Sequence, residues 1–221
     1  MRVSHPFCNM ADEPVEALDA IKFTAAYPKG ALLFVEGEQP RGVFILCGGR
    51  VKLTTTSTEG RTLIVKIANH GEILGASAAI LGKPYEVSAE VLEPSQVSFV
   101  RREDFLRFLN AYTEACMHTA QQLSEKYEAA QREIRSLGLA HTTSEKLARL
   151  ILGWSEDGEV TPQGTRMQVL LTHEEIGQMI GTTRETVTRL LSEFKRKNLI
   201  SIKGSSLFLI ANQQMHDMVS I

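Results

Sequence analysis

The sequence predicts an α+β fold in three parts: an N-terminal antiparallel β-roll, one long helix, and a C-terminal helix-turn-helix followed by a hairpin. Short apolar runs broken by glycine, between Phe23 and Val100, indicate the β-roll. From Cys116 onward, apolar residues recur at intervals of four and three, which is typical of a helix with a narrow contact seam. Around Gly181, two helix-start signals indicate a tight pair of helices.

The composition is that of an ordinary soluble globular protein. The chain has 221 residues, which is enough for one large domain or two small ones with a real core. It is 43% hydrophobic and 23% charged, and its formal net charge is −2. Because the overall charge gives no sign of nucleic-acid affinity, any basic surface must be local.

Cysteine usage and the N-terminus predict a cytoplasmic protein. Cys8, Cys47 and Cys116 are widely separated and odd in number, which argues against a disulfide framework and fits a reducing compartment. The first residues lack the basic start and apolar middle of a secretory signal. No apolar stretch reaches the roughly 20 residues that a membrane-spanning helix requires, so we expect no membrane partner.

Four apolar segments make up the predicted roll, which we assign to a sensor domain over residues 1–110. They read "ALLFVEG", "GVFILCGGRVKL", "TLIVKIANHGEILG" and "YEVSAEVLEPSQVSFV". Runs of this length, rich in β-branched residues and separated by Gly and Pro, favour antiparallel strands that close into a roll, barrel or sandwich. The stretch "STEG", Ser57 to Gly60, predicts a hairpin turn.

Residues 111–138 are predicted to form a dimerisation helix. Its seam holds an a/d pattern for about three heptads, which favours a parallel homodimer; the alternative is a helix that lies on its own β-domain. The seam residues, and the predicted dimer contacts, are Cys116, Ala120, Leu123, Tyr127, Ala130, Ile134 and Leu137. If two copies pair in parallel, Cys116 faces its twin, and a redox-sensitive crosslink is a hypothesis.

Residues 139–221 are assigned to the third part. Gly138 ends or bends the long helix, and Thr142 with Glu145 predicts a capping box at the start of the next helix. The segment Ser155 to Arg166 reads as a polar loop.

Capping boxes at Thr172/Glu175 and Thr182/Glu185 then predict two helices with Gly181 as the turn. An apolar stripe on the second helix is expected to be buried against Ile176 and Ile180, and its members are Val187, Leu190, Leu191 and Phe194.

The opposite face of that second helix carries the residues of greatest functional interest. Arg184, Glu185, Thr188 and Arg189 combine groups that suit base edges in DNA. Arginine can bond guanine bidentately, glutamate can accept from cytosine, and threonine can reach a base or a thymine methyl. The alternative is that Glu185 completes the cap and pairs with Arg189 at i+4.

The surrounding charge supports contact with DNA. Residues 166–203 hold seven Lys or Arg against four Asp or Glu, although the chain is acidic overall. The predicted phosphate contacts are His173, Thr183, Thr186 and, in the hairpin turn, Lys203.

These motifs resemble the CRP/FNR family of bacterial transcription regulators. The stretch "HEEIGQMIGTTRETVTRLLSEFKRKNLISI" resembles its winged helix-turn-helix, and "VEG", "CGGRVKL", "HGEILG" and "REDFLRFL" extend the likeness over about residues 18–210. The resemblance implies a cyclic-nucleotide-binding-like sensor roll, a dimerisation helix and a DNA-binding domain. It also implies a homodimer that reads an inverted repeat with half-sites about 34 Å apart.

The resemblance places Arg184, Glu185 and Arg189 at base-contacting positions. Because Arg184 is present, the half-site is expected to resemble TGTGA, as in the cyclic-AMP receptor branch, more than TTGAT. Thr188 departs from that branch and leaves the middle of the half-site undefined. The loop from Ser155 to Gly164 lies where family activators touch RNA polymerase, which is therefore a candidate partner.

The sensor side departs from the family pattern. A cyclic nucleotide needs an arginine for its phosphate and a glutamate for its ribose. Here Ala76 stands at the glutamate position, Tyr85, Glu86 or Val87 stands at the arginine position, and no arginine occurs between Arg61 and Arg101. We do not expect cyclic AMP to bind in the usual pose, and the effector stays unidentified.

No other cofactor is predicted. An iron–sulfur cluster generally takes four cysteine thiolates, and only Cys8 lies near the N-terminus. His5 and Cys8 are favoured as part of a short N-terminal arm, and the alternative is a contribution to a metal or haem site. His70 reads as a turn residue rather than a haem ligand. No metal-ligand spacing, P-loop or nucleophile motif occurs, so no enzyme is predicted. The alternative function is a small-molecule sensor module without a direct transcriptional role.

Overall fold

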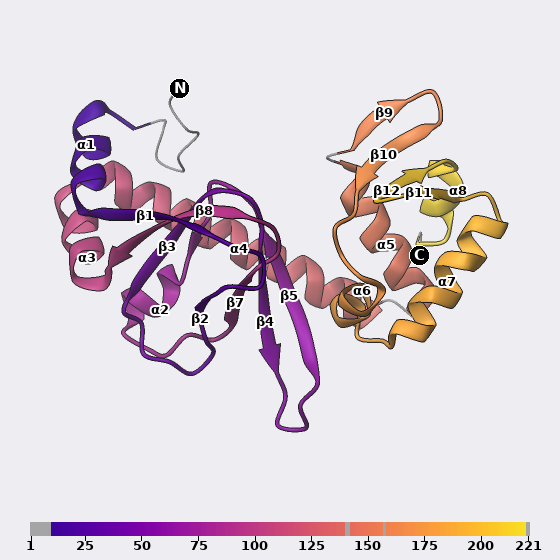
Figure 1. Cartoon of the computed structure of the whole chain (residues 1–221), viewed down its shortest axis with the longest axis horizontal. Helices are drawn as coiled ribbons and strands as arrows, with labels where there is room; N and C mark the ends of the chain where they lie inside the picture. The colour runs from indigo at the N-terminus through magenta and orange to yellow at the C-terminus, as the bar shows by residue number, and fades with distance from the viewer. Residues whose placement is uncertain (1–9, 140–141, 157, 220–221) are drawn as a thin grey trace. The chain divides into compact units, whose positions relative to one another are not determined.

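The computed structural model describes residues 10–139, 142–156 and 158–219, except for the side chains of residues 132–133 and 135–139. The chain forms two compact units that divide between Ala130 and Gln131. Two sheets dominate the first unit, and helices with a smaller sheet form the second (Figure 1). The predicted domain limits at residues 110 and 138 stay predictions.

Two four-stranded antiparallel sheets build the first unit, so the predicted antiparallel roll is confirmed. The first sheet has the order β1-β8-β3-β6, with β1 (Lys22–Tyr27), β8 (Ser95–Arg101), β3 (Gly42–Gly48) and β6 (Ile73–Leu74). The second sheet has the order β2-β7-β4-β5, with β2 (Leu32–Phe34), β7 (Ser88–Val91), β4 (Val51–Thr56) and β5 (Thr62–Ala68).

The predicted hairpin turn joins β4 to β5. The N–H of Ser57 donates to the carbonyl of Arg61 at 2.9 Å, and the N–H of Gly60 donates to the carbonyl of Ser57 at 2.9 Å. Gly60 has φ of 79°, a left-handed conformation that glycine adopts without a steric penalty.

The core of the first unit has two layers because β3 is buried on both faces. On one face, Val43 and Ile45 pack with Leu18 and Phe105 from the helices. On the other face, Phe44 and Leu46 pack in the interior of the roll. The helices of this unit are α1 (Asp12–Ile21), α2 (Ala76–Leu81), α3 (Arg102–Ala111) and α4 (Thr113–Leu139), of which α4 continues past the division.

The described part of the second unit combines the end of α4 and helices α5 to α8 with one antiparallel sheet of order β11-β12-β10-β9. Its elements are α5 (Thr143–Glu156), β9 (Glu159–Thr161), β10 (Gly164–Gln168), α6 (His173–Ile180), α7 (Arg184–Arg196), β11 (Ile200–Lys203), β12 (Ser206–Leu209) and α8 (Asn212–Asp217). The predicted order of helix, turn, helix and hairpin is confirmed over α6 to β12. The Thr142 hydroxyl accepts from the N–H of Glu145 at 3.1 Å, as expected at the start of α5.

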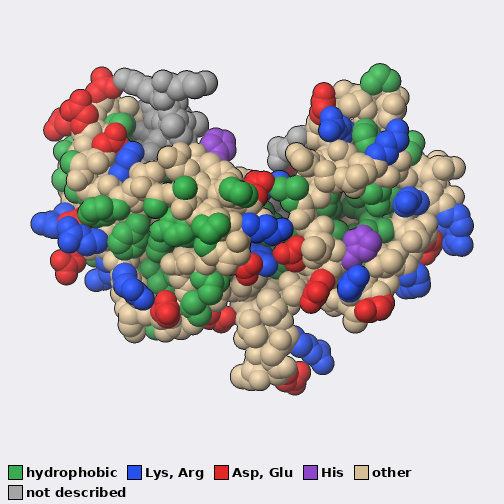
Figure 2. All heavy atoms as spheres, in the orientation of Figure 1, with side chains coloured by type: hydrophobic (Ala, Val, Ile, Leu, Met, Phe, Trp, Pro, Cys, Tyr) green, Lys and Arg blue, Asp and Glu red, His purple; other side chains and the backbone are tan. Residues whose placement is uncertain are grey.

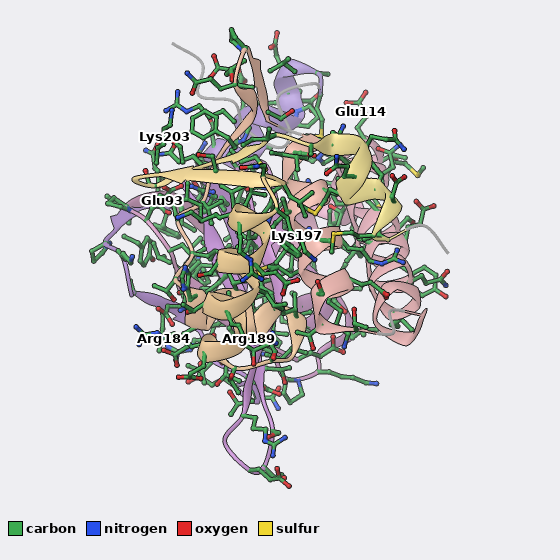
Figure 3. All side chains as sticks on the ribbon, turned by 90° about the vertical axis from the view of Figure 1, so that its right-hand side faces the viewer. Glu93, Glu114, Arg184, Arg189, Lys197 and Lys203 are labelled. Atoms are coloured by element: carbon green, nitrogen blue, oxygen red, sulfur yellow. The ribbon has the colours of Figure 1, made fainter. Side chains whose placement is uncertain are left out.

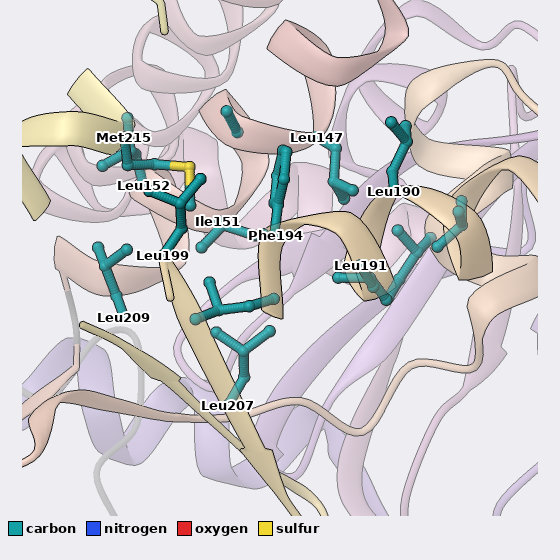
Figure 4. Close-up of a cluster of buried hydrophobic side chains, with 14 of the residues drawn as sticks. Leu147, Ile151, Leu152, Leu190, Leu191, Phe194, Leu199, Leu207, Leu209 and Met215 are labelled. Carbon is teal, nitrogen blue, oxygen red and sulfur yellow. The ribbon is translucent and has the colours of Figure 1, made fainter. Parts of the chain in front are cut away.

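A single apolar core holds this unit together (Figure 4). Phe194 from α7 lies among Leu147 and Ile151 of α5, and all three are 0% exposed. Each such side chain contributes about 1.5–3 kcal/mol through burial. The predicted stripe is confirmed, because Val187, Leu190 and Leu191 are buried with Phe194 in the cluster that contains Ile176 and Ile180.

The predicted polar loop of this unit is wrong. The segment from Ser155 to Arg166 is not simply a polar loop, because it contains β9 and the start of β10, which pair as a hairpin. Both strands are short and mostly polar, so they lack the apolar alternation that marks a strand. The pairing of β10 with β12 supplies the support that an isolated hairpin would lack.

Candidate nucleic-acid interface

A tight turn sets the angle between α6 and α7. Gly181 ends α6 with φ of 69°, and the N–H of Thr182 donates to the carbonyl of Gly177 at 2.9 Å. A Cβ atom at Gly177 would lie 2.7 Å from the carbonyl oxygen of Thr182, so only glycine permits this close approach. The capping box of Thr172 and Glu175 is confirmed at the start of α6.

The second predicted capping box is wrong by one residue. Thr183, rather than Thr182, caps α7, and its hydroxyl accepts from the N–H of Thr186 at 3.3 Å. The physical reason is that the backbone of Thr182 closes the preceding turn. Glu185 consequently occupies the second position of the helix, where its own N–H and the Thr183 hydroxyl bond its carboxylate and lower its pKa.

The four predicted base-contacting residues share the exposed face of α7. Arg184, Glu185, Thr188 and Arg189 are all exposed, whereas the opposite face is buried in the core. Arg184 and Arg189 lie near one another at one end of this surface in Figure 3, and Lys203 is well separated from them. The carboxylate of Glu185 is bonded at the cap of α7. Among the described residues, Glu185 and Arg189 form no ion pair, so the predicted alternative pairing at i+4 is not seen.

Thr188 is tied to α6 by a hydrogen bond that the sequence did not predict. Its hydroxyl donates to the carbonyl of Arg184 at 2.9 Å, and Nδ1 of His173 lies 2.8 Å from the same oxygen. A hydroxyl whose proton is directed at a carbonyl can still accept, so Nδ1 donates to Thr188 in the tautomer that carries its proton there.

The other predicted phosphate contacts lie at two places in this unit. The hydroxyls of Thr183 and Thr186 are 3.2 Å apart at the N-terminus of α7, where the helix dipole favours an anion. Lys203 ends β11, donates from Nζ to Oε1 of Gln163 at 3.0 Å, and lies 5.6 Å from the ring centroid of Phe208. An ammonium has three donors, so Lys203 retains hydrogens for a phosphate.

Further basic side chains lie at the C-terminal end of α7. Lys195, Arg196 and Lys197 are exposed, and Nζ of Lys197 lies 2.8 Å from Oε1 of Glu193. That lysine lowers the pKa of Glu193. Figure 2 shows Lys and Arg side chains along the edge of the unit where Figure 1 draws α7. The local basic surface expected from the sequence therefore exists on the same helix as the four predicted base-contacting residues.

The predicted dimer seam forms an exposed stripe along α4. Tyr127 and Ile134 are 66% and 69% exposed, and three small seam residues are exposed as well: Cys116, Ala120 and Ala130. Leu123 differs, because it is half-buried against the core of the roll. The side chain of Leu137 lies outside the described residues. In the described part of the helix, Ala115 and Thr119 make the buried face instead.

Polar side chains of α4 also bond the edge of the roll, which the sequence pattern did not reveal. Oε1 of Gln122 accepts from the N–H of Ile73 at 3.1 Å, and its Nε2 donates to the carbonyl of Gly71 at 2.8 Å. Nζ of Lys126 donates to the carbonyl of Ile73 at 2.6 Å, and burial lowers the pKa of this lysine. These residues flank the seam, where solvent exposure was the simpler expectation.

Of the positions that the resemblance assigns to cyclic-nucleotide binding, Ala76 and Tyr85 are buried, Val87 is half-buried and Glu86 is exposed. Ala76 is 3% exposed at the start of α2. Tyr85 is 4% exposed, its ring stacks on Phe34 at 4.1 Å, and its hydroxyl donates to the carbonyl of Gly42 at 2.8 Å. Burial raises the pKa of Tyr85. This residue thus completes the apolar interior of the roll.

The remaining predicted features concern cysteines, metals and membranes. Cys47 is half-buried with Sγ 3.3 Å from Oγ of Ser98, and His5 and Cys8 lie outside the described residues.

Within residues 10–139, 142–156 and 158–219, no group of three or more His, Cys, Asp or Glu side chains is placed to hold a metal ion. No helix in this described part is long and apolar enough to span a membrane.

Comparison with known proteins accounts for both units. A family model described as the cyclic nucleotide-binding domain matches residues 24–112, and one described as the Crp-like helix-turn-helix domain matches residues 145–215. The chain is 24% identical over 182 residues to the cAMP-activated global transcriptional regulator CRP of Pasteurella multocida, covering 82% of this chain and 87% of that relative. It is 25% identical over 178 residues to the Global nitrogen regulator of Synechocystis sp., covering 80% and 79%.

Solved structures share the fold. FixK2 from Bradyrhizobium japonicum is similar with a TM-score of 0.79 at 20% identity, covering 91% of this chain and 98% of that one. A CooA mutant from Carboxydothermus hydrogenoformans also has a TM-score of 0.79, at 21% identity, covering 92% and 90%. Taken with the sheets, the α6–α7 pair and the two family models, these similarities show that the chain belongs to the CRP/FNR family of transcription regulators and carries a helix-turn-helix DNA-binding domain.

Proposed function

We propose that this regulator acts as a homodimer that binds an inverted-repeat, TGTGA-like promoter site by placing α7 of each copy in the major groove. The observation that carries the proposal is the division of α7 into two faces. Val187, Leu190 and Phe194 fix one face in the core, and Arg184 and Arg189 project from the other. A helix held this rigidly can direct its side chains at base edges.

The chemistry of the exposed face suits specific reading. An arginine guanidinium can bond O6 and N7 of guanine bidentately, and a carboxylate can accept from N4 of cytosine. Because its cap bonds favour the ionised form of Glu185, that carboxylate is an acceptor and not a donor at neutral pH. Together, two cations separated by one acceptor favour alternating guanine and cytosine contacts over a uniform phosphate contact.

The exposed stripe on α4 supports the homodimer. Cys116, Ala120, Tyr127 and Ile134 leave apolar surface open along a helix whose other side is already packed. An apolar stripe of this kind typically marks a protein interface. A second copy presents the same a/d spacing, and the alanine permits close approach of two helices. Two copies would then supply the two reading helices that an inverted repeat requires.

We further propose that an effector or redox signal at the β-roll controls DNA binding, and that cyclic AMP is not that effector. Tyr85 stands in the region where the family carries its phosphate-binding arginine, and its hydroxyl already donates to Gly42. Calorimetric titration with cyclic AMP is expected to show no saturable heat, and tight stoichiometric binding would contradict this. A spectrum and native mass of the purified protein would identify any bound group.

RNA polymerase is a proposed further partner. The hairpin of β9 and β10 exposes Val160 at 86%, and an apolar side chain this open favours contact with another protein. The alternative function, a sensor module without a transcriptional role, has support only from the match to the cyclic nucleotide-binding domain model. It leaves the exposed face of α7 without a purpose.

Fluorescence anisotropy with a selected inverted repeat, at one stated salt concentration, tests the proposal. Arg184→Ala should weaken binding by about 1–3 kcal/mol and relax the preference at one base position. Arg196→Ala, a matched control at the far end of α7, should weaken all sequences slightly and leave the preference unchanged. Uniform weakening by Arg184→Ala on every duplex would contradict a base-reading role.

A further inference from the structure

The hydroxyl of Thr188 is committed inside the protein. It donates to the carbonyl of Arg184 at 2.9 Å, and its oxygen lies 2.8 Å from Nδ1 of His173, so its only proton is engaged within the protein in either tautomer of the imidazole. A threonine hydroxyl offers one donor and two acceptor positions. No proton remains for the O4, O6 or N7 acceptors of a base. Thr188 is nevertheless exposed, so it can offer a ligand its Cγ2 methyl and one unused acceptor position, but no hydrogen-bond donor.

The imidazole of His173 determines how this threonine is oriented. Threonine in a helix divides between two χ1 rotamers because its hydroxyl can bond a carbonyl in the preceding turn from either. Only a rotamer whose oxygen faces α6 can also meet His173, which stands at the first residue of that helix. The bond across the two helices therefore selects one rotamer and fixes the place of the methyl.

A fixed methyl on the reading face favours one kind of base. Thymine differs from uracil by the C5-methyl group, which lies in the major groove. Two methyl groups in contact gain by leaving water, and neither needs a hydrogen bond. The committed hydroxyl disfavours the competing role, in which Thr188 would donate to a purine.

We propose that Thr188 is a thymine-methyl reader and that His173 is the residue that positions it. The proposal rests on the proposed function, because it assumes that α7 enters the major groove. It defines the part of the half-site that the resemblance to the cyclic-AMP receptor branch leaves open. His173 is then a specificity residue in addition to any contact that it makes with phosphate.

Replacing thymine by deoxyuridine, one position at a time, tests the reader directly. The duplex is the inverted repeat that the full-length protein selects from a randomised pool. Thr188 of each copy should read one position in its half-site, so the replacement there removes one methyl group from each half-site. Binding should then weaken by about fourfold for each half-site, the effect expected for one buried methyl-sized group. At the other positions, deoxyuridine should bind as well as thymine.

Two substitutions at residue 188 separate the methyl from the hydroxyl. Thr188→Val keeps the methyl and removes the hydroxyl, so the ratio of thymine to deoxyuridine affinity should stay at about fourfold per half-site. Thr188→Ser keeps the hydroxyl and removes the methyl, so the ratio should fall to one. Both residues fit an exposed helical position, and a circular dichroism spectrum confirms that each variant is folded.

The positioning role has its own readout. His173→Ala should lower the thymine-to-deoxyuridine ratio, because the second rotamer of Thr188 becomes accessible. In the double variant His173→Ala with Thr188→Val, the ratio should return, since valine in a helix holds one rotamer without help. A residue that only contacts phosphate would weaken both duplexes equally and leave the ratio unchanged.

The possible outcomes distinguish a failure of the thymine-methyl reader from a failure of the proposed function. Failure of the full-length protein to bind any inverted repeat would overturn both. Binding that depends on Arg184 but is indifferent to deoxyuridine everywhere would overturn the methyl reader alone. An unchanged ratio in His173→Ala would overturn the positioning role, and a ratio of one in Thr188→Val would show that the hydroxyl does the reading.

Discussion

The α6–α7 pair and the β-roll organise their important polar contacts over different distances along the chain. In the α6–α7 pair, Thr172 bonds Glu175, Thr183 bonds Thr186, and even His173 and Thr188 are separated by only 15 positions. In the first unit, the hydroxyl of Tyr85 bonds a residue 43 positions away, and Gln122 and Lys126 bond residues 51 and 53 positions away.

This difference explains why the reading surface is recognisable in the sequence and the sensor is not. Helix caps, the turn at Gly181 and the apolar stripe of α7 follow from local periodicity and local hydrogen bonds. The interior of the roll depends on strands that are distant in sequence and meet only in the fold. Its chemistry is therefore visible only once the strands are paired.

The largest expected effect tests whether the second unit depends on its own core. Phe194→Ala should lower the free energy of unfolding of this unit by about 3–5 kcal/mol, because it removes a fully buried ring. Specific DNA binding should be lost with it. Urea unfolding followed by circular dichroism measures the change.

Phe105→Ala provides the comparison in the first unit, since that ring is also 0% exposed. It should cost a similar free energy, but the transition that it shifts should be that of the roll. If each substitution shifted both transitions equally, the two units would not behave as separate folding bodies.

The next effect concerns the seam on α4. Ala120→Glu places a carboxylate opposite its twin in a parallel dimer, so sedimentation should show a monomer. Loss of the second reading helix should weaken binding to an inverted repeat by about 10²–10⁴-fold. Gln121→Glu adds the same charge one residue off the seam, and it should leave both the dimer and the affinity unchanged.

A smaller effect is expected inside the roll. Tyr85→Phe removes the hydrogen bond to the carbonyl of Gly42 and keeps the ring stacked on Phe34. The cost should be about 1 kcal/mol in the unfolding free energy of the first unit, with DNA binding unaffected. A large loss of DNA affinity with an unchanged stability would instead place Tyr85 in the path of regulation.

The smallest predicted effect is a dependence on pH. Burial lowers the pKa of His118 below its ordinary 6.5, although Glu125 partly opposes the shift. The unfolded chain therefore binds a proton more readily, and stability falls as the pH drops from above 6.5 toward the lowered pKa. Urea midpoints at pH 7 and pH 5 measure this. His118→Gln should reduce the difference, and an unchanged difference in this variant would contradict the assignment.

Particular residues show where sequence reasoning succeeded and where it stopped. The antiparallel roll, the exposed seam on α4 and the exposed face of α7 were predictable, because the periodicity of apolar residues distinguishes buried positions from exposed ones. The cap of α7 was misplaced by one residue, because two adjacent threonines, Thr182 and Thr183, present the same signal. The β9–β10 hairpin was missed because its stability comes from pairing with β12.

Other features had no signal in the sequence. Gln122 and Lys126 look like solvent-facing flanks of a helix, and only the fold brings them to the end of β6. Helix α1 has one strong anchor, Leu18 at 0% exposure, which is too little to define a helix from a pattern. His173 and Thr188 were both predicted to contact DNA, but the bond between them depends on the angle at which α6 meets α7.

The central claim is that two copies of α7 read one duplex with a fixed separation. Half-sites of the selected inverted repeat should lie about 34 Å apart on one side of the DNA. Inserting half a helical turn between the half-sites moves one of them to the opposite face of the duplex. Mass photometry with anisotropy titrations should show two chains per parent duplex and, on the altered duplex, about 10²–10⁴-fold weaker binding. One chain per duplex, or equal affinity for both spacings, would contradict the account.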